Sequence, residues 1–324
     1  MTLDRRATCI GVDWGMTNRR AWLLDSKGAV IADKADDRGI LAIAGHCFAE
    51  SLEAFLGPWL RGAHPLPILM AGMIGSRDGW HETPYLEAPC PLAELAGQLA
   101  RLEPINGGIP YIVSGIAKPP NSGSGPDVMR GEECQILGAM LVRNMSDGLF
   151  LLPGTHSKWA VLNAGSLVDF RTYMTGELFD HLRRSGTLAQ VMKGDAFDEA
   201  AFDLGVSTAM AEGSASLPHL LFGLRALALF GRLKPEEAPS YLSGLLVGAE
   251  MTDVLAWIRK RREPGPIVAV GSARLLCIYG RAADLCAIRL EMVESATVLP
   301  TALFALAEGA GLIEASGRSP IRGK

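Results

Sequence analysis

The sequence predicts an α/β protein built from two similar halves, and three observations support this. Of the 324 residues, 48% are apolar and 37 are glycine, a composition typical of globular α/β proteins. Short apolar runs that fit strands alternate with longer runs that fit helices. A unit of strand, glycine turn, strand, glycine turn and strand occurs twice, as IGVD-WGMTNRR-AWLLD-SKG-AVIA and as LFLL-PGTHSK-WAVL-NAG-SLVDF. A duplicated domain with a cleft between the copies is therefore expected.

The first half is expected to hold the first repeat and the elements that cover it. Its predicted strands are 8–12, 21–24, 28–32, 68–70 and 109–114. Its predicted helices are 46–60, 92–102 and 132–142. The segment Pro119–Pro126 (PPNSGSGP) excludes helix and strand and predicts a loop. We place the first domain at residues 1–144.

The second half is expected to be more helical than the first. The predicted order is a strand at 149–152, a hairpin of 159–162 with 166–172, a helical region from 177 to about 262, a strand at 267–270 and a helix at 301–312. We place the second domain at residues 145–324, with the last helix packing back on the first domain.

Charge and cysteine spacing exclude several classes of protein. The formal net charge of −4 argues against a nucleic-acid or membrane-surface partner. The 6 cysteines form no CxxC pair, which predicts neither a zinc site nor a disulfide framework. No run reads as a signal peptide or as a bilayer-spanning helix. We expect a cytoplasmic protein.

The turn of the first repeat places a carboxylate directly after a buried strand. Asp13 could cap its own turn by accepting backbone amide bonds. Alternatively, it faces the cleft and holds a hydrated Mg²⁺, which prefers a few carboxylates with water and phosphate oxygens. In that case Gly15 admits a phosphate close to the backbone, and Thr17, Asn18 and Arg19 supply donors.

The turn of the second repeat has a similar composition. It contains a glycine followed by polar side chains, namely Gly154, Thr155, His156, Ser157 and Lys158. Two donor-rich turns at matching places in duplicated halves predict a clamp for the phosphates of a nucleotide triphosphate. A serine-hydrolase role for Ser157 is rejected, because no GxSxG surrounds it.

Several motifs together resemble a known family. GVDWGMTN, LLPGTHSK and IVAVGSA resemble the two phosphate motifs and the adenosine motif of the sugar-kinase, Hsp70 and actin superfamily. GMIGSRDGW, DVMRGEECQILGA, LLPGTHSKW and FRTYMTGELF resemble the 2-dehydro-3-deoxygalactonokinase family, in that family's order. Met16 departs from the superfamily, whose members usually carry a small polar residue there.

The resemblance implies two actin-like (ribonuclease H-like) ATPase domains flanking a nucleotide cleft. It implies phosphorylation of 2-dehydro-3-deoxy-D-galactonate on its terminal (6-) hydroxyl, with ATP and Mg²⁺ as cofactors and domain closure to exclude water. Gly271, Ser272 and Ala273 then contact the adenosine.

The substrate's carboxylate needs a cation, and Arg77 is the candidate because a guanidinium matches a carboxylate in shape. Ser76, Trp80 and Glu177 are further substrate candidates. The alternatives are a surface ion pair for Arg77 with Asp78 or Glu82, ordinary packing for Trp80, and a helix start at Glu177.

The general base is expected at the start of the helix at 132–142. Related sugar kinases carry an aspartate at this junction, and Glu132 fits the position best, with Asp127 as the rival. Both Glu132 and Glu133 could instead favour the helix N-terminus electrostatically.

Other functions stay open at this point. The substrate could be the gluconate-derived keto-deoxy acid, which differs at one stereocentre. The protein could also be a non-kinase actin-like ATPase with a protein partner, or a sugar-sensing regulator. The sequence leaves the oligomeric state open, including a homodimer.

Overall fold

The computed structural model describes residues 7–62, 64–121, 125–213, 216–259 and 266–314. The chain divides into two compact units. Unit 1 consists of Met1–Asp147, Val161–Phe170 and Val293–Lys324, and unit 2 of Gly148–Ala160 and Arg171–Met292. The domain bounds expected from the sequence stay a prediction.

The main sheet of unit 1 has the order β3-β2-β1-β4-β8-β7. These strands are β1 (Ala7–Trp14), β2 (Arg19–Asp25), β3 (Val30–Asp36), β4 (Leu66–Ala71), β7 (Ala100–Arg101) and β8 (Gly108–Ile112). β1 is antiparallel to β2 and parallel to β4, so its end and that of β4 lie at the same edge of the sheet.

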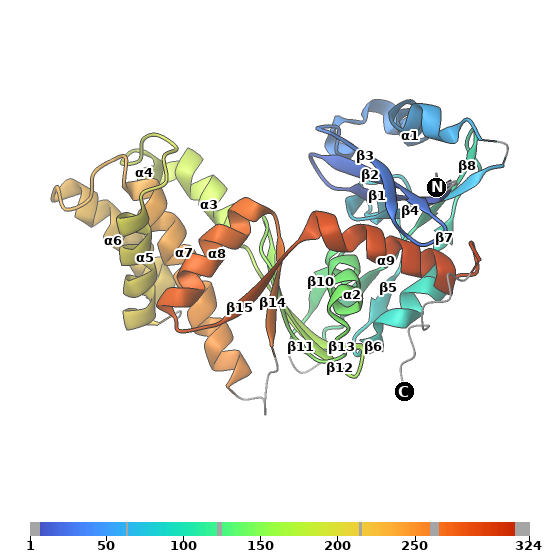
Figure 1. Ribbon diagram of the computed structural model, residues 1–324. Helices are drawn as coiled ribbons and strands as arrows, with labels where there is room; N and C mark the ends of the chain where they lie inside the picture. The colour runs from blue at the N-terminus through green and yellow to red at the C-terminus, as the bar shows by residue number, and fades with distance from the viewer. Residues whose placement is uncertain (1–6, 63, 122–124, 214–215, 260–265, 315–324) are drawn as a thin grey trace, which may run out of the picture. The chain divides into compact units, whose positions relative to one another are not determined.

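Helices cover both faces of this sheet (Figure 1). Helix α1 (Phe48–Leu56) packs Phe48, Leu52 and Leu56 into the core that β1 and β4 form. Helix α9 (Ser295–Gly309) contacts β1, β4 and α2 (Glu132–Arg143). The glycine at position 11 of β1 is required by this packing, because a Cβ there would lie 2.9 Å from Leu303 of α9.

Short elements complete unit 1. A second sheet has the order β10-β9-β5. The remaining elements are β5 (Tyr85–Glu87), β9 (Gly115–Lys118), β10 (Asp127–Met129) and the 3₁₀ turns η1 (Ile40–Ala42), η2 (Ala44–His46), η3 (Gly57–Leu60), η4 (Met73–Gly75) and η5 (Leu92–Gln98).

The third sheet has the order β15-β14-β11-β12-β13-β6. Its strands are β6 (Cys90–Pro91), β11 (Gly148–Leu152), β12 (Ser157–Asn163), β13 (Ser166–Tyr173), β14 (Ile267–Gly271) and β15 (Leu290–Glu294). The order β13-β12-β11-β14-β15 repeats the order β3-β2-β1-β4-β8. The duplicated strand pattern in the sequence therefore corresponds to a duplicated strand order.

The helices of unit 2 are α3 (Thr175–Arg184), α4 (Gly186–Ala189), α5 (Glu199–Glu212), α6 (Leu217–Leu229), α7 (Ala238–Ile258) and α8 (Ala273–Leu285). Helix α7 contacts α3, α5, α6 and α8 and forms the centre of the unit's core. It is long and apolar enough to cross a membrane, contrary to the expectation from the sequence. However, 72% of its apolar window is buried inside the protein, as is usual for a core helix.

Two other expectations differ from the structure, and a third agrees with it. Residues 92–102 form the 3₁₀ turn η5 and the short strand β7 rather than one helix. The last helix begins at Ser295 and accommodates Pro300, whereas the sequence predicted a start at residue 301. Residues 119–126 lie outside helices and strands as expected, with 122–124 outside the described residues.

Candidate active site

Three loops of unit 1 converge beside Asp13. Asp13 pairs with Ala71 in the parallel register of β1 and β4, so the loops that follow both strands start together. Gly72 has a φ of 93°, and a Cβ there would lie 2.9 Å from the Trp14 carbonyl oxygen and 3.2 Å from Asp13 Oδ1. A Cβ on Gly131, whose φ is 104°, would lie 3.1 Å from the Gly72 Cα. Glycine therefore lets the three backbones meet at this carboxylate.

Asp13 does not cap its turn. Within the described part of the chain, no group donates a hydrogen bond to its carboxylate, and the turn is closed instead by Gly15 N–H donating to the Asn18 carbonyl. Burial raises the pKa of Asp13 to about 6, the charge of Arg20 opposes this, and the charge of Glu132 adds to it. A poorly hydrated carboxylate without donors is suited to an external cation.

Two glutamates begin helix α2, and each binds a backbone amide before it. Glu132 Oε2 accepts from Arg130 N–H at 3.0 Å. Glu133 is fully buried and accepts from Gly131 N–H with both oxygens, at 2.8 and 2.7 Å. Burial and the charge of Glu132 raise the pKa of Glu133 to about 7. Both carboxylates thus accept backbone N–H groups at the helix N-terminus, the place that the alternative interpretation gives them.

The rival base has a different setting. Asp127 begins β10, and its carboxylate accepts from Val128 N–H at 2.8 Å. Glu132, in contrast, is electrostatically coupled to Asp13. The coupling supports Glu132 as the carboxylate nearer to the Asp13 loop.

The loop after β4 contains the predicted substrate residues. Arg77 is exposed, and no carboxylate of a described residue lies within ion-pair distance of it. Ser76 is buried, and its hydroxyl donates to the Met73 carbonyl at 2.7 Å. Trp80 stacks on Phe48 with ring centroids 6.4 Å apart. Arg77 is thus available to a ligand, whereas the Ser76 hydroxyl and the Trp80 ring already have partners within the unit.

Arg130 joins this loop to the start of α2, a role that the sequence did not reveal. Its guanidinium is buried, lies over the ring of Tyr85 at 4.3 Å and donates to the Thr83 carbonyl at 2.9 Å and to the Thr83 hydroxyl. Thr83 in turn donates its N–H to the Gly75 carbonyl. The partners are about 50 residues apart in the chain, so spacing gives no signal of the contact.

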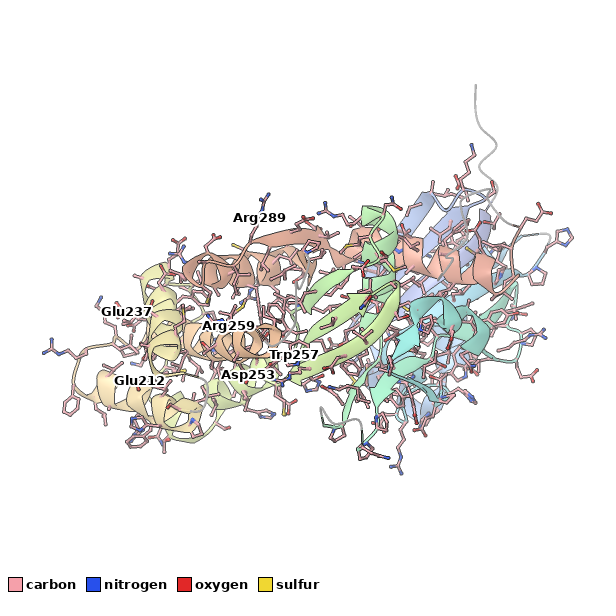
Figure 2. The ribbon with its side chains drawn as sticks, turned by 90° about the horizontal axis from the view of Figure 1, so that it is seen from below. Glu212, Glu237, Asp253, Trp257, Arg259 and Arg289 are labelled. Atoms are coloured by element: carbon pink, nitrogen blue, oxygen red, sulfur yellow. The ribbon has the colours of Figure 1, made fainter. Side chains whose placement is uncertain are left out.

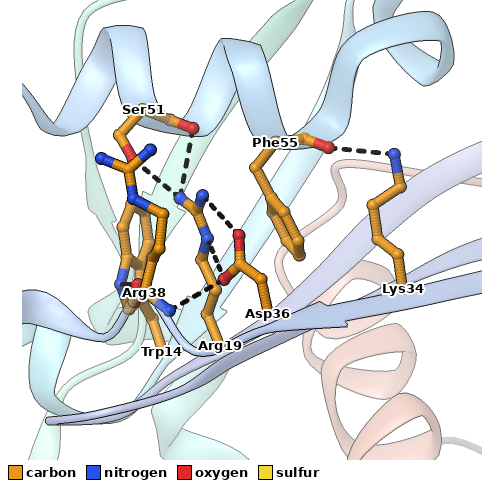
Figure 3. Close-up of polar contacts among 7 residues, drawn as sticks. All are labelled: Trp14, Arg19, Lys34, Asp36, Arg38, Ser51 and Phe55. Atoms are coloured by element: carbon orange, nitrogen blue, oxygen red, sulfur yellow. Dashed lines mark hydrogen bonds and ion pairs between the residues drawn. The ribbon is translucent and has the colours of Figure 1, made fainter. Parts of the chain in front are cut away.

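The first turn has two exposed donors, Thr17 and Asn18, with the Asn18 amide donating to the Thr17 hydroxyl at 3.0 Å. Arg19, in contrast, is buried and unavailable, which contradicts its expected phosphate contact. It forms a bidentate ion pair with Asp36 at 2.8 and 2.9 Å and donates to the carbonyl and hydroxyl of Ser51 (Figure 3). Arg19 joins β2, β3 and α1 and is a structural residue.

The second turn, in unit 2, also contains both exposed and buried side chains. Thr155 and His156 are exposed and Gly154 is half-buried, so all three can reach a ligand. Ser157 is fully buried and donates to Glu250 at 2.8 Å, which contradicts a direct phosphate contact. Lys158 is buried too, and its ammonium group donates to the His156 carbonyl at 3.3 Å.

The start of α3 packs against this turn. Glu177 N–H donates to the Thr155 carbonyl, and the Glu177 carboxylate pairs with the His156 ring. A Cβ on Gly176 would lie 2.5 Å from the Gly154 carbonyl oxygen. Glu177 therefore packs against the second turn, through Thr155 and His156.

A cavity of about 420 Å³ opens beside the turn, a volume within the usual range for small-molecule sites. It brings together Gly154 and Thr155 of the turn with Ser272 of the predicted adenosine motif. Ser272 also caps α8 by accepting from Leu275 N–H at 3.5 Å. Gly271 is buried against Pro153, and Ala273 is exposed.

Most of the cavity wall was not predicted. Its remaining residues come from α3, from 195–197, from α7 and from α8. They are Thr175, Gly176, Phe179, Asp180, Arg183, Asp195, Ala196, Phe197, Pro239, Ser240, Ser243, Leu246, Val247, Arg274, Leu275, Ile278 and Tyr279. These residues form no local motif, because the fold assembles them from four separate segments.

The described residues hold no group of three or more histidine, cysteine, aspartate or glutamate side chains arranged for a metal ion. A protein-only metal centre is therefore absent from the described part. A Mg²⁺ ion that takes most of its ligands from water and phosphate fits the single carboxylate of Asp13.

Solved structures with little sequence identity show the fold. Gluconate kinase from Lactobacillus acidophilus has a TM-score of 0.51 at 10% identity, covering 95% of this chain and 90% of the other. The (R)-2-hydroxyglutaryl-CoA dehydratase component A of Acidaminococcus fermentans has a TM-score of 0.51 at 13% identity, covering 94% and 100%. The fold is that of the actin-like ATPases and sugar kinases.

Closer likenesses identify the family. The family model described as 2-keto-3-deoxy-galactonokinase matches residues 13–306. The chain is 36% identical to a probable 2-dehydro-3-deoxygalactonokinase of Rhizobium meliloti, covering 91% of this chain and 95% of the relative. It is 33% identical to the 2-dehydro-3-deoxygalactonokinase of Escherichia coli, covering 85% and 89%.

A crystal structure from Sinorhizobium meliloti, provisionally described as a 2-dehydro-3-deoxygalactonokinase, gives a TM-score of 0.85 at 34% identity and covers 93% of this chain and 98% of the other. The chain belongs to the 2-keto-3-deoxy-galactonokinase family, a family of carbohydrate kinases. The resemblance seen in the sequence motifs is confirmed.

Proposed function

We propose that this protein transfers the γ-phosphoryl group of ATP to the 6-hydroxyl of 2-dehydro-3-deoxy-D-galactonate, in the cytoplasm, as a step of galactonate catabolism. The observation that supports the proposal is the cavity of unit 2, where Gly154 and Thr155 of the predicted phosphate turn and Ser272 of the predicted adenosine motif line one space. Relatives at 33% and 36% identity bear the name of this activity.

In unit 2 the nucleotide would lie along that cavity. Gly154 admits a phosphate close to the backbone, and Thr155 and His156 supply donors. Ser272, at the N-terminus of α8, lines the same cavity and would contact the nucleoside. The largely apolar wall formed by Phe197, Leu246 and neighbouring residues suits a nucleobase.

In unit 1, two carboxylates would serve phosphoryl transfer, one by holding the metal ion and one by orienting the acceptor's hydroxyl. Asp13 would hold a hydrated Mg²⁺, with Gly15, Thr17 and Asn18 as phosphate donors. When bound, the ion would neutralise phosphate charge. Glu132 would orient the hydroxyl and accept its proton late in the transfer, as expected for a loose transition state.

The unpaired Arg77 would bind the carboxylate of the sugar acid. Its guanidinium offers a two-pronged contact that an ammonium group lacks. Its exposure and the absence of an ion-pair partner among the described residues support this assignment over a surface salt bridge.

The test is ATP turnover with the keto-deoxy acid, compared among variants of three carboxylates. Asp13→Asn should lower turnover by orders of magnitude, because it removes the charge and keeps the shape.

Glu132→Gln should lower kcat by roughly a hundredfold or more with little change in KM, a usual cost for a lost general base. Asp127→Asn should have a smaller effect.

The matched control is Asp25, which ends β2 and does cap its turn, accepting from Lys27 and Ala29 N–H at 2.9 Å. Asp25→Asn should keep normal turnover. Wild-type turnover by Asp13→Asn at saturating ATP and Mg²⁺ would refute the metal role. ATP turnover that responds to unfolded polypeptide and not to the acid would indicate a chaperone-type ATPase instead.

A further inference from the structure

Glu250 is a buried carboxylate in the middle of α7 that the proposed chemistry does not use. Only 3% of the residue is exposed. Its Oε1 accepts from the Ser157 hydroxyl at 2.8 Å and from the Trp159 indole N–H at 2.7 Å. Its Oε2 accepts from the Tyr279 hydroxyl at 2.8 Å and from the Thr175 hydroxyl. Each oxygen thus has two donors.

These four donors lie in the elements that form the nucleotide cavity. Ser157 and Trp159 are the first and third residues of β12, directly after the phosphate turn. Thr175 begins α3, whose next two residues pack on Gly154 and Thr155. Thr175 and Tyr279 also line the cavity. One carboxylate therefore connects the phosphate turn, α3 and α8 to α7.

Burying a carboxylate in this place costs free energy, and its hydrogen bonds have to offset that cost. No cationic nitrogen of a described residue lies within ion-pair distance of Glu250. Burial raises its pKa, and the hydrogen bonds of the four donors lower it. An apolar side chain would avoid the burial cost but would leave four polar groups without a partner.

We propose that Glu250 is a positioning residue that sets the geometry of the nucleotide site and thereby determines the affinity of the protein for ATP. It acts through Ser157 and Thr175, which hold the phosphate turn and the start of α3 against each other. The proposal rests on the proposed ATP-dependent function and adds a residue about 90 positions away from the turn that it orients.

The alternative is that Glu250 only stabilises the fold, and a control on the same helix separates the two. Asp253 lies one turn along α7 and accepts from Tyr173 Oη at 2.6 Å and from Arg171 Nη1 at 2.9 Å. Arg171 stacks over Trp257, which Figure 2 shows beside Asp253. Asp253, Arg171 and Tyr173 are not part of the cavity wall.

The experiment measures binding of a non-hydrolysable ATP analogue with Mg²⁺ by calorimetry, for wild type, Glu250→Gln and Asp253→Asn. Glutamine keeps the shape but places an NH₂ group against two hydroxyl donors. The dissociation constant should rise about tenfold for Glu250→Gln, the usual cost of one mismatched buried hydrogen bond. It should stay within about twofold for Asp253→Asn, since this half-exposed pair lies outside the cavity wall.

The KM for the sugar acid should remain unchanged in both variants, which separates positioning from general destabilisation. Equal weakening in the two variants, or wild-type affinity in Glu250→Gln, would overturn the proposal. If Glu250→Gln does not fold, Ser157→Ala decides, because Ser157 is not part of the cavity wall and leaves three donors in place. Its nucleotide dissociation constant should rise about fivefold.

Failure of the proposed function would look different. A wild-type protein that does not bind the analogue would refute ATP dependence, and with it this inference. A wild-type protein that binds the analogue, with unaltered affinity in Glu250→Gln (or in Ser157→Ala, where Glu250→Gln does not fold), would refute the positioning role alone.

Discussion

Glu133 lies fully buried at the start of α2, where two bonds from Gly131 N–H only partly offset its loss of hydration. Its pKa is about 7 in the folded protein against an ordinary value of 4.5. Between these values the folded state binds the proton more often than the unfolded state. Stability from this group is therefore present at low pH and is lost as pH rises through about 4.5 to 7.

Glu133→Gln should remove this pH dependence. The difference in unfolding free energy between variant and wild type should shift in favour of the variant between pH 5 and pH 8, by up to about 3 kcal/mol. Urea unfolding at several pH values measures this difference in unfolding free energy. The contribution of Asp13 to the pH dependence cancels, because wild type and variant both carry Asp13. An unchanged difference across this range would show that Glu133 is ionised at all these pH values in the folded protein.

At the residue scale, the sequence predicts which turns form the site but not which side chains in them are exposed. Arg19 follows Thr17 and Asn18 directly, and nothing local distinguishes it as buried. Its partner Asp36 ends a strand that was predicted to stop at residue 32, so the ion pair was not foreseeable. Ser157 likewise faces Glu250, 93 positions away.

At the scale of elements, the phosphate turn depends on how closely α3 approaches it. The space between Gly176 and Gly154 does not accommodate a side chain, since a Cβ on Gly176 would lie 2.5 Å from a backbone oxygen. Either the turn or the helix start would have to move.

Gly176→Ala should therefore raise the KM for ATP by about tenfold to a hundredfold, the scale expected for displacement of a binding group by about 1 Å. The KM for the sugar acid should hardly change. Gly223→Ala in α6 is the matched control, because a Cβ there meets nothing within 4 Å. Equal kinetics for Gly176→Ala and wild type would mean that ATP binding does not depend on this turn.

Long periodic elements were predictable, whereas short ones were not. The strands of both repeats follow from alternating apolar residues and glycine turns. The sheet β10-β9-β5 was missed because its strands have only three or four residues, and because β5 pairs with a strand far along the chain. Residues 92–102 have helical apolar spacing but form a 3₁₀ turn, since Leu92 and Leu95 alone are buried there.

At the scale of the whole molecule, a repeated strand order holds different functional groups in each unit. Unit 1 presents Asp13, Glu132 and Arg77, which suit an acidic sugar with a hydroxyl acceptor. Unit 2 presents the phosphate turn and a 420 Å³ cavity, which suit a nucleotide. We therefore expect two different ligands, and phosphoryl transfer from one to the other.

The most direct test follows the phosphorus atom by NMR in a mixture of wild-type protein, ATP, Mg²⁺ and 2-dehydro-3-deoxy-D-galactonate. We expect one phosphomonoester per ADP, with its phosphorus coupled to the protons on carbon 6, and no ATP consumption without the acid. A parallel reaction with the gluconate-derived isomer measures how strongly the enzyme discriminates between the two configurations of the stereocentre. Release of inorganic phosphate without a sugar ester, or an ester on another carbon, would contradict the account.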